Sequence, residues 1–190
     1  CFNNISKLNE KVVAVWSKIL TNLPKSRLMI QARPLQQIST ADRIRSLFAA
    51  EGITEERLLF GAGAEHEKFL HFYNQADIAL DPFPYSGGLT TLESLWMGVP
   101  VVTLPGENFA GRHSLSHLSN LGLTNLIARD ADDYIRIATA FASDRDRLSA
   151  LRQLLRPNMA NSVLTDAAGY TNALEVAYRD AWRKWCGTRA

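Results

Sequence analysis

The chain has 190 residues, 46% of them hydrophobic and 21% charged, so it is long enough to bury a core without disulfides or metals. Its 21 basic and 19 acidic residues give a formal net charge of +2 and are dispersed, which argues against nucleic acid and anionic membranes as partners. The two cysteines fit neither a disulfide framework nor a zinc site, and we expect a cytoplasmic protein.

The sequence lacks membrane and signal segments, and its start indicates a fragment. No apolar run reaches the ~18 residues that a membrane-spanning helix needs, and no signal-peptide pattern is present. The sequence begins at Cys1 without methionine and enters a helical pattern almost at once. We therefore expect a soluble chain that is a piece cut from a longer protein.

The first part of the chain alternates between helix and strand patterns. Apolar residues from Val12 to Leu20 recur at the spacing of one helix face, and the pattern stops before Pro24. The predicted elements are a helix over 8–22, a strand over Ser26–Ala32, a helix over Asp42–Ala50 and a strand over Arg57–Phe60.

The alternation continues through the middle of the chain. The predicted elements are a helix over Glu65–Gln75, a strand over Ile78–Leu80, a helix over Thr90–Met97 and a strand over Val99–Leu104. This order predicts parallel strands joined by helical crossovers. Because the strands are apolar without polar alternation, both faces of the sheet should be covered. The sequence therefore predicts an α/β fold with a doubly wound, Rossmann-like parallel sheet.

The last part of the chain is mainly helical. We expect helices over His113–Leu121, Asp132–Ala142 and Arg145–Arg156, with a short apolar segment at Asn125–Ala128. A final helix over about 166–186 places an aromatic stripe on one face, made of Tyr170, Leu174, Tyr178, Trp182 and Trp185. We predict one domain over 1–190, with part of this stripe facing a missing partner lobe.

A glycine turn follows the strand Ile78–Leu80, at the edge where open parallel sheets bind ligands. The segment 81–93 reads DPFPYSGGLTTLE. Gly87 and Gly88 let backbone amides approach a ligand, and the helix start adds free N–H groups and the positive end of its dipole, which suits a diphosphate. Thr90 and Thr91 can cap the helix, and Glu93 can accept hydrogen bonds from a ribose diol. From spacing alone, an ordinary structural turn is the more frequent explanation.

The wider sequence resembles the C-terminal half of the O-linked N-acetylglucosamine transferase family, of bacterial type. The matches occur in order over nearly the whole chain, which makes them more specific than one turn. They comprise Phe2–Lys7, Trp16–Leu20, Pro24–Leu28, Ala76–Gly106, Ala110–Arg112, Leu121–Ala128 and Tyr134.

This resemblance implies a glycosyltransferase with two Rossmann-like lobes, the architecture called GT-B, that inverts the sugar configuration without a metal. The present chain corresponds to the lobe that holds a UDP-sugar, which is a substrate, so no cofactor is expected. A preceding lobe, often joined to helical repeats, would hold the protein acceptor and the general base. The chain alone is then an incomplete and inactive half of the enzyme.

Residues of the site are carried over position by position. Lys7 matches the lysine that contacts the donor diphosphate and stabilises the leaving group, and Asn4 matches a glutamine near the donor. Taken alone, Lys7 would be read as a solvated lysine before a helix. Ala64 matches a backbone contact to uracil, and His66 a residue near the phosphates.

The glycine turn completes this expected donor site. Gly87 and Thr91 lie in the segment assigned to the diphosphate, Gly88, Leu89 and Thr90 match its phosphate-contacting positions, and Glu93 matches the acid that binds ribose. Leu89 departs from the usual threonine, and Phe69 replaces a histidine found in animal-type members. Both departures leave donor specificity open.

Three polar residues near this edge have competing explanations. Arg112 follows an Ala-Gly pair at a helix start and could touch donor or acceptor, but a capping or interdomain ion pair explains it equally well. His113 and His117 are four apart, as zinc ligands can be, yet no glutamate motif or third ligand accompanies them. We therefore predict no metal site.

Two alternatives remain beside transfer of N-acetylglucosamine from UDP to a serine or threonine hydroxyl. The same fold could use another donor, UDP-glucose or GDP-fucose, because the glycine turn does not fix the base. A nucleotide-binding or interaction module without turnover is the second alternative.

Overall fold

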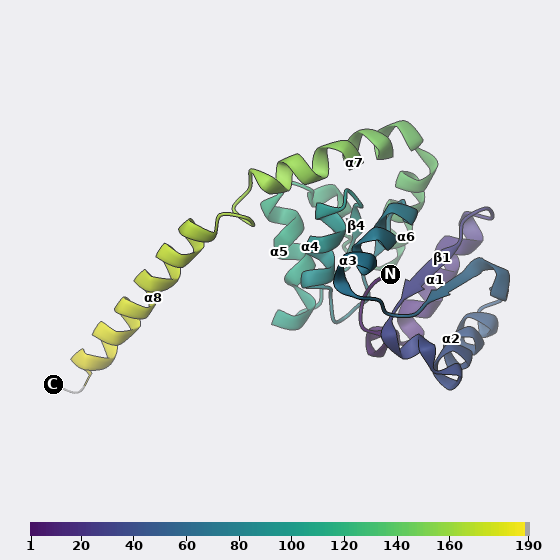
Figure 1. Ribbon diagram of the computed structural model, residues 1–190, viewed down its shortest axis with the longest axis horizontal. Helices are drawn as coiled ribbons and strands as arrows, with labels where there is room; N and C mark the ends of the chain where they lie inside the picture. Colours follow the sequence, from purple (N-terminus) through teal and green to yellow (C-terminus); the bar gives the residue numbers. More distant parts are fainter. Residues whose placement is uncertain (189–190) are drawn as a thin grey trace.

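The computed structural model describes residues 1–188, and its strands are joined by helices in the predicted order (Figure 1). β1 (Leu28–Gln31) pairs in parallel with β2 (Leu58–Gly61), and β3 (Ala79–Leu80) pairs in parallel with β4 (Val101–Val102). Thr103 adds an isolated parallel bridge to Ile127. All these pairings are parallel, as the alternating sequence pattern predicts.

Eight α-helices and six 3-10 turns lie within the described residues, and one of the turns directly continues a helix. The α-helices are α1 (Glu10–Asn22), α2 (Ile38–Ala50), α3 (His66–His71), α4 (Leu89–Trp96), α5 (His113–Asn120), α6 (Ala131–Ser143), α7 (Arg145–Ala160) and α8 (Ala167–Gly187). The 3-10 turns are η1 (Ile5–Lys7), η2 (Arg33–Gln36), η3 (Glu55–Arg57), η4 (Phe72–Gln75), η5 (Phe109–Gly111) and η6 (Thr124–Leu126).

Some boundaries differ from the sequence prediction. α2 begins at Ile38, four residues before the predicted start, and the predicted helix over Glu65–Gln75 divides into α3 and a 3-10 turn. The predicted strand over Val99–Leu104 is reduced to β4 (Val101–Val102). At its start, the Val99 amide donates to the Ser94 carbonyl oxygen in the turn after α4, and at its end the Thr103 amide donates to the Leu126 carbonyl oxygen.

α7 is longer than predicted and runs through a proline. The pattern ended at Arg156, but the helix continues to Ala160 with Pro157 inside its last turn. Proline lacks an N–H and removes one bond of the i to i−4 ladder, which is the reason to expect a helix to stop there. Met159 is buried in this last turn, so packing against the body holds the extra residues in helical form.

The core lies between the strands and the helices that cross over them. α1 packs against α2 and α6, while α4 packs against α5 and α7. The largest fully buried side chains are Trp16, Tyr73, Tyr134, Phe48 and Ile30. Apolar burial of this kind is the main term that stabilises the fold.

The first residues of the chain lie in the middle of the body, between the two strand pairs (Figure 1). The Cys1 amino group donates to the Met29 carbonyl oxygen at 2.6 Å, and the Gln31 amide donates to the Cys1 carbonyl oxygen at 2.9 Å. Phe2 then stacks on Tyr73 with 3.9 Å between ring centroids. The residues that follow are thereby anchored close to the carboxyl end of β3.

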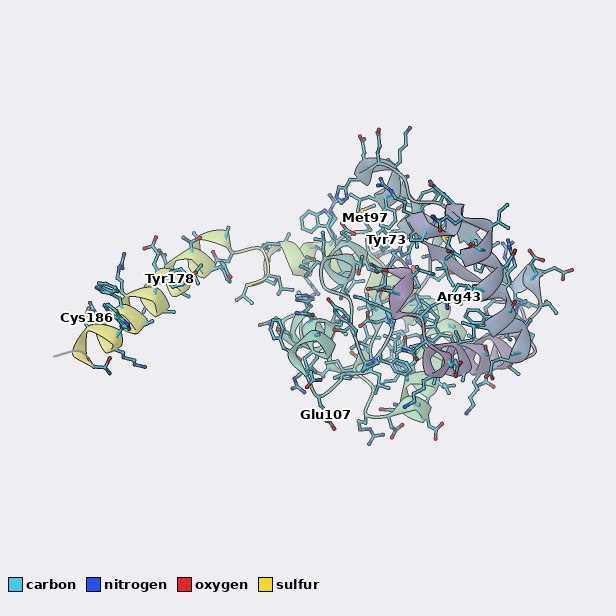
Figure 2. All side chains as sticks on the ribbon, turned by 90° about the horizontal axis from the view of Figure 1, so that it is seen from below. Arg43, Tyr73, Met97, Glu107, Tyr178 and Cys186 are labelled. Atoms are coloured by element: carbon cyan, nitrogen blue, oxygen red, sulfur yellow. The ribbon has the colours of Figure 1, made fainter. Side chains whose placement is uncertain are left out.

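α8 projects away from the body as a separate rod, and Figure 2 shows Tyr178 and Cys186 far from the other labelled side chains. Every described residue of this helix is exposed, including its aromatic stripe. Trp182 and Trp185 stack on each other at 5.0 Å. The packing of this stripe on another surface stays a prediction.

None of the helices within residues 1–188 is long and apolar enough to cross a membrane.

Candidate functional site

Asp81 and Gly87 form the base of the glycine turn at the carboxyl end of β3. The Gly87 amide donates to Asp81 Oδ1 at 2.6 Å. A Cβ at Gly87 would lie 2.4 Å from Thr91 Oγ1 and 2.9 Å from Asp81 Oδ1, closer than real Cβ contacts. Only glycine therefore allows the turn to approach the carboxylate this closely.

α4 begins at Leu89, directly after this turn. If Thr90 were the cap, the helix would begin two residues later, at Thr91. Gly88 is the N-cap residue and supplies no side-chain cap. The prediction that Thr90 and Thr91 cap the helix is wrong, because both lie inside its first turn. Thr90 Oγ1 donates to Asn3 Oδ1 at 3.2 Å, and Thr91 Oγ1 lies 2.8 Å from Ser114 Oγ. Their hydroxyls connect α4 to neighbouring segments instead.

The first amides of α4 are available to an anion. Within residues 1–188, no group accepts a hydrogen bond from the amides of Gly88, Leu89 or Thr90. The space beside Gly88 is open, since a Cβ placed there would meet nothing within 4 Å. Free N–H groups at the positive end of a helix dipole form a favourable anion site. The free N–H groups that the sequence predicts at this helix start are present, and binding of an anion to them stays a prediction.

Lys7, at the end of η1, brings a cation to the same turn. Its Nζ donates to the Ser86 carbonyl oxygen at 2.7 Å and to Asn3 Oδ1 at 3.1 Å, and it lies 4.2 Å from the centroid of the Tyr85 ring. Burial lowers the pKa of Lys7, and the Asp81 carboxylate opposes that shift. The structure thus joins Lys7 to the glycine turn.

Asn4, the predicted donor contact, and the adjacent Asn3 lie in different surroundings. Asn4 is exposed, and its Oδ1 accepts hydrogen bonds from the Ser6 amide and hydroxyl at 3.0 and 2.9 Å, which caps η1. Asn3 is buried and its Oδ1 bridges Lys7 and Thr90. The resemblance favoured Asn4, and nothing in the local pattern distinguishes two adjacent asparagines.

Glu93 lies one turn into α4, next to a histidine and a buried tyrosine. His66 Nδ1 is 3.6 Å from Glu93 Oε1, and the Glu93 side chain is 11% exposed. Burial raises the pKa of Glu93, whereas His66 and Tyr73 lower it. Tyr73 donates to the Thr90 carbonyl oxygen at 3.1 Å. His66 and Glu93 together form a polar rim beside the free amides.

Three predicted residues remain, at the two sides of the glycine turn in the sequence and at its helix start. Ala64 is half-buried in the loop between β2 and α3, and Leu89 is 68% exposed at the first position of α4. Arg112 is exposed at the N-cap position of α5, and no hydrogen bond or ion pair of its side chain is recorded among the described residues. Among the described residues, no hydrogen bond or ion pair joins Ala64 or the Arg112 side chain to Lys7, Asn3 or Ser86.

Two serines that sequence reasoning missed hold the turn from behind. The buried Ser86 Oγ donates to the Ala110 carbonyl oxygen and accepts from the His113 amide at 3.1 Å. Ser114 Oγ donates to the Gly87 carbonyl oxygen at 3.0 Å. Serines have no local signal for such roles, because their partners lie more than twenty residues away.

Asn9 is a further missed residue, and this one had a detectable signal. It is the N-cap of α1, where its Oδ1 accepts from the Val12 amide at 3.0 Å. Its Nδ2 donates to the Phe83 carbonyl oxygen at 2.9 Å. An asparagine just before a helix pattern is a common capping signal. The same side chain fixes the loop that leads into the glycine turn.

His113 and His117 lie on α5, behind the turn. Their Nδ1 atoms are buried and have no hydrogen-bond partner in the described part of the chain. Burial lowers the pKa of His117, and the nearby His113 lowers it further. Within residues 1–188, no group of three or more His, Cys, Asp or Glu side chains is placed to hold a metal ion.

One large cavity lies away from this cluster, and a very small one lies beside it. A cavity of about 770 Å³ lies at the amino edge of the strands, lined by Lys25, Asp77, Arg145 and Arg152 among others. The hollow beside Asp81 and Thr90 measures only about 10 Å³. The candidate site is therefore an open surface at the carboxyl edge of the strands.

Comparison with known families decides the identity of the chain. The model of glycosyl transferase family 41 matches residues 1–174. The chain belongs to this family. Solved structures agree: a variant of the Thermobaculum terrenum O-GlcNAc transferase superposes with a TM-score of 0.95 at 41% identity, over 100% of this chain and 36% of that one. The fold prediction and the family resemblance are confirmed.

Relatives of this chain include proteins named as N-acetylglucosaminyltransferases. A Petunia hybrida protein, "Probable UDP-N-acetylglucosamine--peptide N-acetylglucosaminyltransferase SPINDLY", is 41% identical over 97% of this chain and 20% of its own length. A Caenorhabditis elegans protein, "UDP-N-acetylglucosamine--peptide N-acetylglucosaminyltransferase", is 30% identical over 97% of this chain and 16% of its own length. The chain thus spans about a fifth of the curated relatives it matches.

Proposed function

We propose that this family 41 chain is the donor-binding lobe of a glycosyltransferase that moves N-acetylglucosamine from UDP to a serine or threonine hydroxyl of a protein. The observation that carries the proposal is the junction of Lys7 with the glycine turn, beside three free amides at the start of α4. The names of the relatives support UDP-N-acetylglucosamine and a peptide as substrates.

The chemistry of this junction suits departure of a nucleoside diphosphate. The acceptor oxygen attacks C1 of the sugar, and the electron pair of the breaking C1–O bond moves onto a phosphate oxygen of UDP. Lys7 and the amides of Gly88, Leu89 and Thr90 would meet that new charge. Because ammonium, amides and a helix dipole supply this stabilisation, the proposed site requires no metal or cofactor.

The remaining residues would hold the nucleoside. Glu93 can accept hydrogen bonds from both hydroxyls of ribose, and His66, which lies 3.6 Å from its carboxylate, can contact ribose or phosphate. The backbone near Ala64 would face the base. The Nδ2 of Asn4 would donate a hydrogen bond to the UDP-sugar, since only its Oδ1 is bonded within η1. Arg112 would reach the donor or acceptor from α5.

The general base and acceptor site are assigned to another lobe, together with any helical repeats. The proton of the acceptor hydroxyl would leave to a group outside this chain. The exposed aromatic stripe of α8 is an apolar face that such a lobe would cover. On this proposal the chain alone binds UDP weakly and transfers no sugar.

Calorimetric titration of the chain with UDP and with GDP tests the proposal. We expect saturable binding of UDP in the millimolar range or tighter, and weaker binding of GDP. Lys7→Ala should weaken the UDP signal, whereas Lys11→Ala, which changes an exposed lysine four residues later on α1, should leave it unchanged.

Each outcome of this titration has a defined meaning. A folded chain with no saturable UDP signal at millimolar ligand would overturn donor binding and favour an interaction module. Tighter binding of GDP than UDP would retain the fold and change the donor. Sugar transfer by the chain alone would contradict the assignment of the base to another lobe.

A further inference from the structure

Asp81 is a buried acid at the centre of the candidate site, although no charged partner contacts it directly. Its exposure is 1%, and it lies immediately after β3. Oδ1 accepts from the Gly87 amide at 2.6 Å, and Oδ2 accepts from Thr103 Oγ1 at 2.8 Å. A buried carboxylate is unfavourable unless hydrogen bonds satisfy both oxygens, and here both are engaged.

The bonds of Asp81 join segments that the chain keeps far apart. Through Gly87 it holds the turn before α4, and through Thr103 it holds the residue that follows β4. Its own carbonyl oxygen accepts from the Tyr134 hydroxyl of α6 at 3.0 Å. The start of α4 is thus tied to the ends of two strands through one side chain.

The consequence falls on the next residues of the turn. The Gly87 amide points into the protein toward Asp81, and the amides of Gly88, Leu89 and Thr90 are the ones left without acceptors within residues 1–188. Because peptide planes are rigid, fixing one amide in a tight turn limits the directions of its neighbours. Asp81 selects which amide faces inward.

We propose that Asp81 is a positioning residue of the donor site, whose carboxylate fixes the Gly87 amide and thereby aims the next three amides at the diphosphate. This inference rests on the proposed function. The acceptor oxygen is what matters for the role, more than the negative charge, since a second negative charge beside a diphosphate is unfavourable.

The proposal distinguishes asparagine from alanine at this position. Asp81→Asn keeps an acceptor oxygen for the Gly87 amide, and its new amide group can donate to Thr103 Oγ1. Asp81→Ala removes both acceptors and leaves the Gly87 amide buried without a partner. We expect UDP affinity within about threefold of the parent chain for asparagine, and a loss of about tenfold or more for alanine, as for hydrogen bonds to charged groups.

The test uses calorimetric titration of UDP together with NMR of the Gly87 amide. A 2.6 Å bond to a carboxylate should shift the Gly87 amide proton far downfield, and the shift should move as Asp81 titrates, with Lys7 and Tyr134 as the other titratable groups facing it. Asp81→Asn should abolish the titration while keeping UDP affinity. Asp77→Ala is the matched control, because that aspartate precedes the same strand and is exposed.

The outcomes separate this inference from the proposed function. The positioning role of Asp81 would be overturned if Asp81→Ala bound UDP as tightly as the parent chain. It would also be overturned if Asp81→Asn bound UDP as weakly as Asp81→Ala. If Asp81→Ala fails to fold, Thr103→Val, which removes the donor to Oδ2, should still weaken UDP binding, and an unchanged affinity would count against the role. If the parent chain itself does not bind UDP, the proposed function is wrong, and so is the claim that the three amides point at a diphosphate. The titration of the Gly87 amide proton still shows in that case whether Asp81 holds the turn.

Discussion

The ammonium of Lys7 donates a 2.7 Å hydrogen bond to the carbonyl oxygen of Ser86, 79 residues later in the chain. Ser86 directly precedes Gly87, so this bond places the cation next to the free amides of the glycine turn. Lys7 is held there by Asn3 as well, which leaves its ammonium little freedom to move away. These two bonds hold the ammonium beside the turn.

Replacing Lys7 by alanine should reduce turnover of the full-length enzyme far more than donor binding. Loss of one preorganised charge that stabilises the leaving group typically lowers turnover about 10²–10³-fold. Steady-state kinetics that separate kcat from KM check this, with Lys11→Ala as the control. Unchanged turnover would remove Lys7 from the mechanism.

The two adjacent glycines should respond differently to alanine. In Gly87→Ala the new Cβ would meet Thr91 Oγ1 and Asp81 Oδ1, and overpacking of this kind typically destabilises by about 1–3 kcal/mol. In Gly88→Ala the Cβ enters open space, so stability should change little while UDP affinity falls, because that space is where the diphosphate would lie. Thermal unfolding and UDP titration of both variants decide this, and equal behaviour of the pair would contradict the geometry.

Glu93→Ala should weaken nucleotide binding by on the order of 1–3 kcal/mol, through loss of hydrogen bonds from ribose to a charged group. The weakening should be smaller for 2′-deoxy-UDP, which has one hydroxyl fewer to lose. Glu67→Ala, at an exposed position on α3, serves as the control. An affinity for UDP that stays at the parent value would exclude Glu93 from the ribose site.

Asp81 should make stability fall as the pH rises from about 4 to 6. Burial raises the pKa of Asp81 from 3.8 to about 6, although hydrogen bonds and Lys7 oppose the shift. In that range the folded chain binds more protons than the unfolded chain, so the free energy of unfolding falls with pH, by on the order of 3 kcal/mol in total. Denaturant unfolding at pH 4 and pH 7 checks this. The free energy of unfolding of Asp81→Asn, relative to that of the parent chain, should be higher at pH 7 than at pH 4. The same difference at both pH values would contradict the raised pKa.

Ending the chain at Asp166 should leave the thermal stability of the body unchanged. Every described residue of α8 is exposed, so its removal takes away no buried apolar surface from the core. Circular dichroism of the shortened chain should show the same midpoint with less helical signal. A midpoint lower by several degrees would mean that α8 packs on the body in solution.

The sequence by itself determined the features that depend on short stretches of chain. The alternation of apolar helix faces with apolar strands predicted the parallel α/β fold, and Gly87-Gly88 ahead of a helix predicted an anion-friendly turn. Such features are local, because a period of 3.6 residues or a pair of glycines acts on its own neighbours. The ends of elements, such as those of α7 and β4, were less predictable because partners distant in sequence set them.

Only the tertiary structure decided which side chains meet. Asn3 and Asn4 look alike in the sequence, yet η1 turns one toward Lys7 and the other toward Ser6. Asp81 reads as the end of a strand until the structure brings Thr103 and Gly87 to its two oxygens. The physical reason is that a buried polar group is satisfied by whatever the fold brings within about 3 Å, and that distance carries no trace in local sequence.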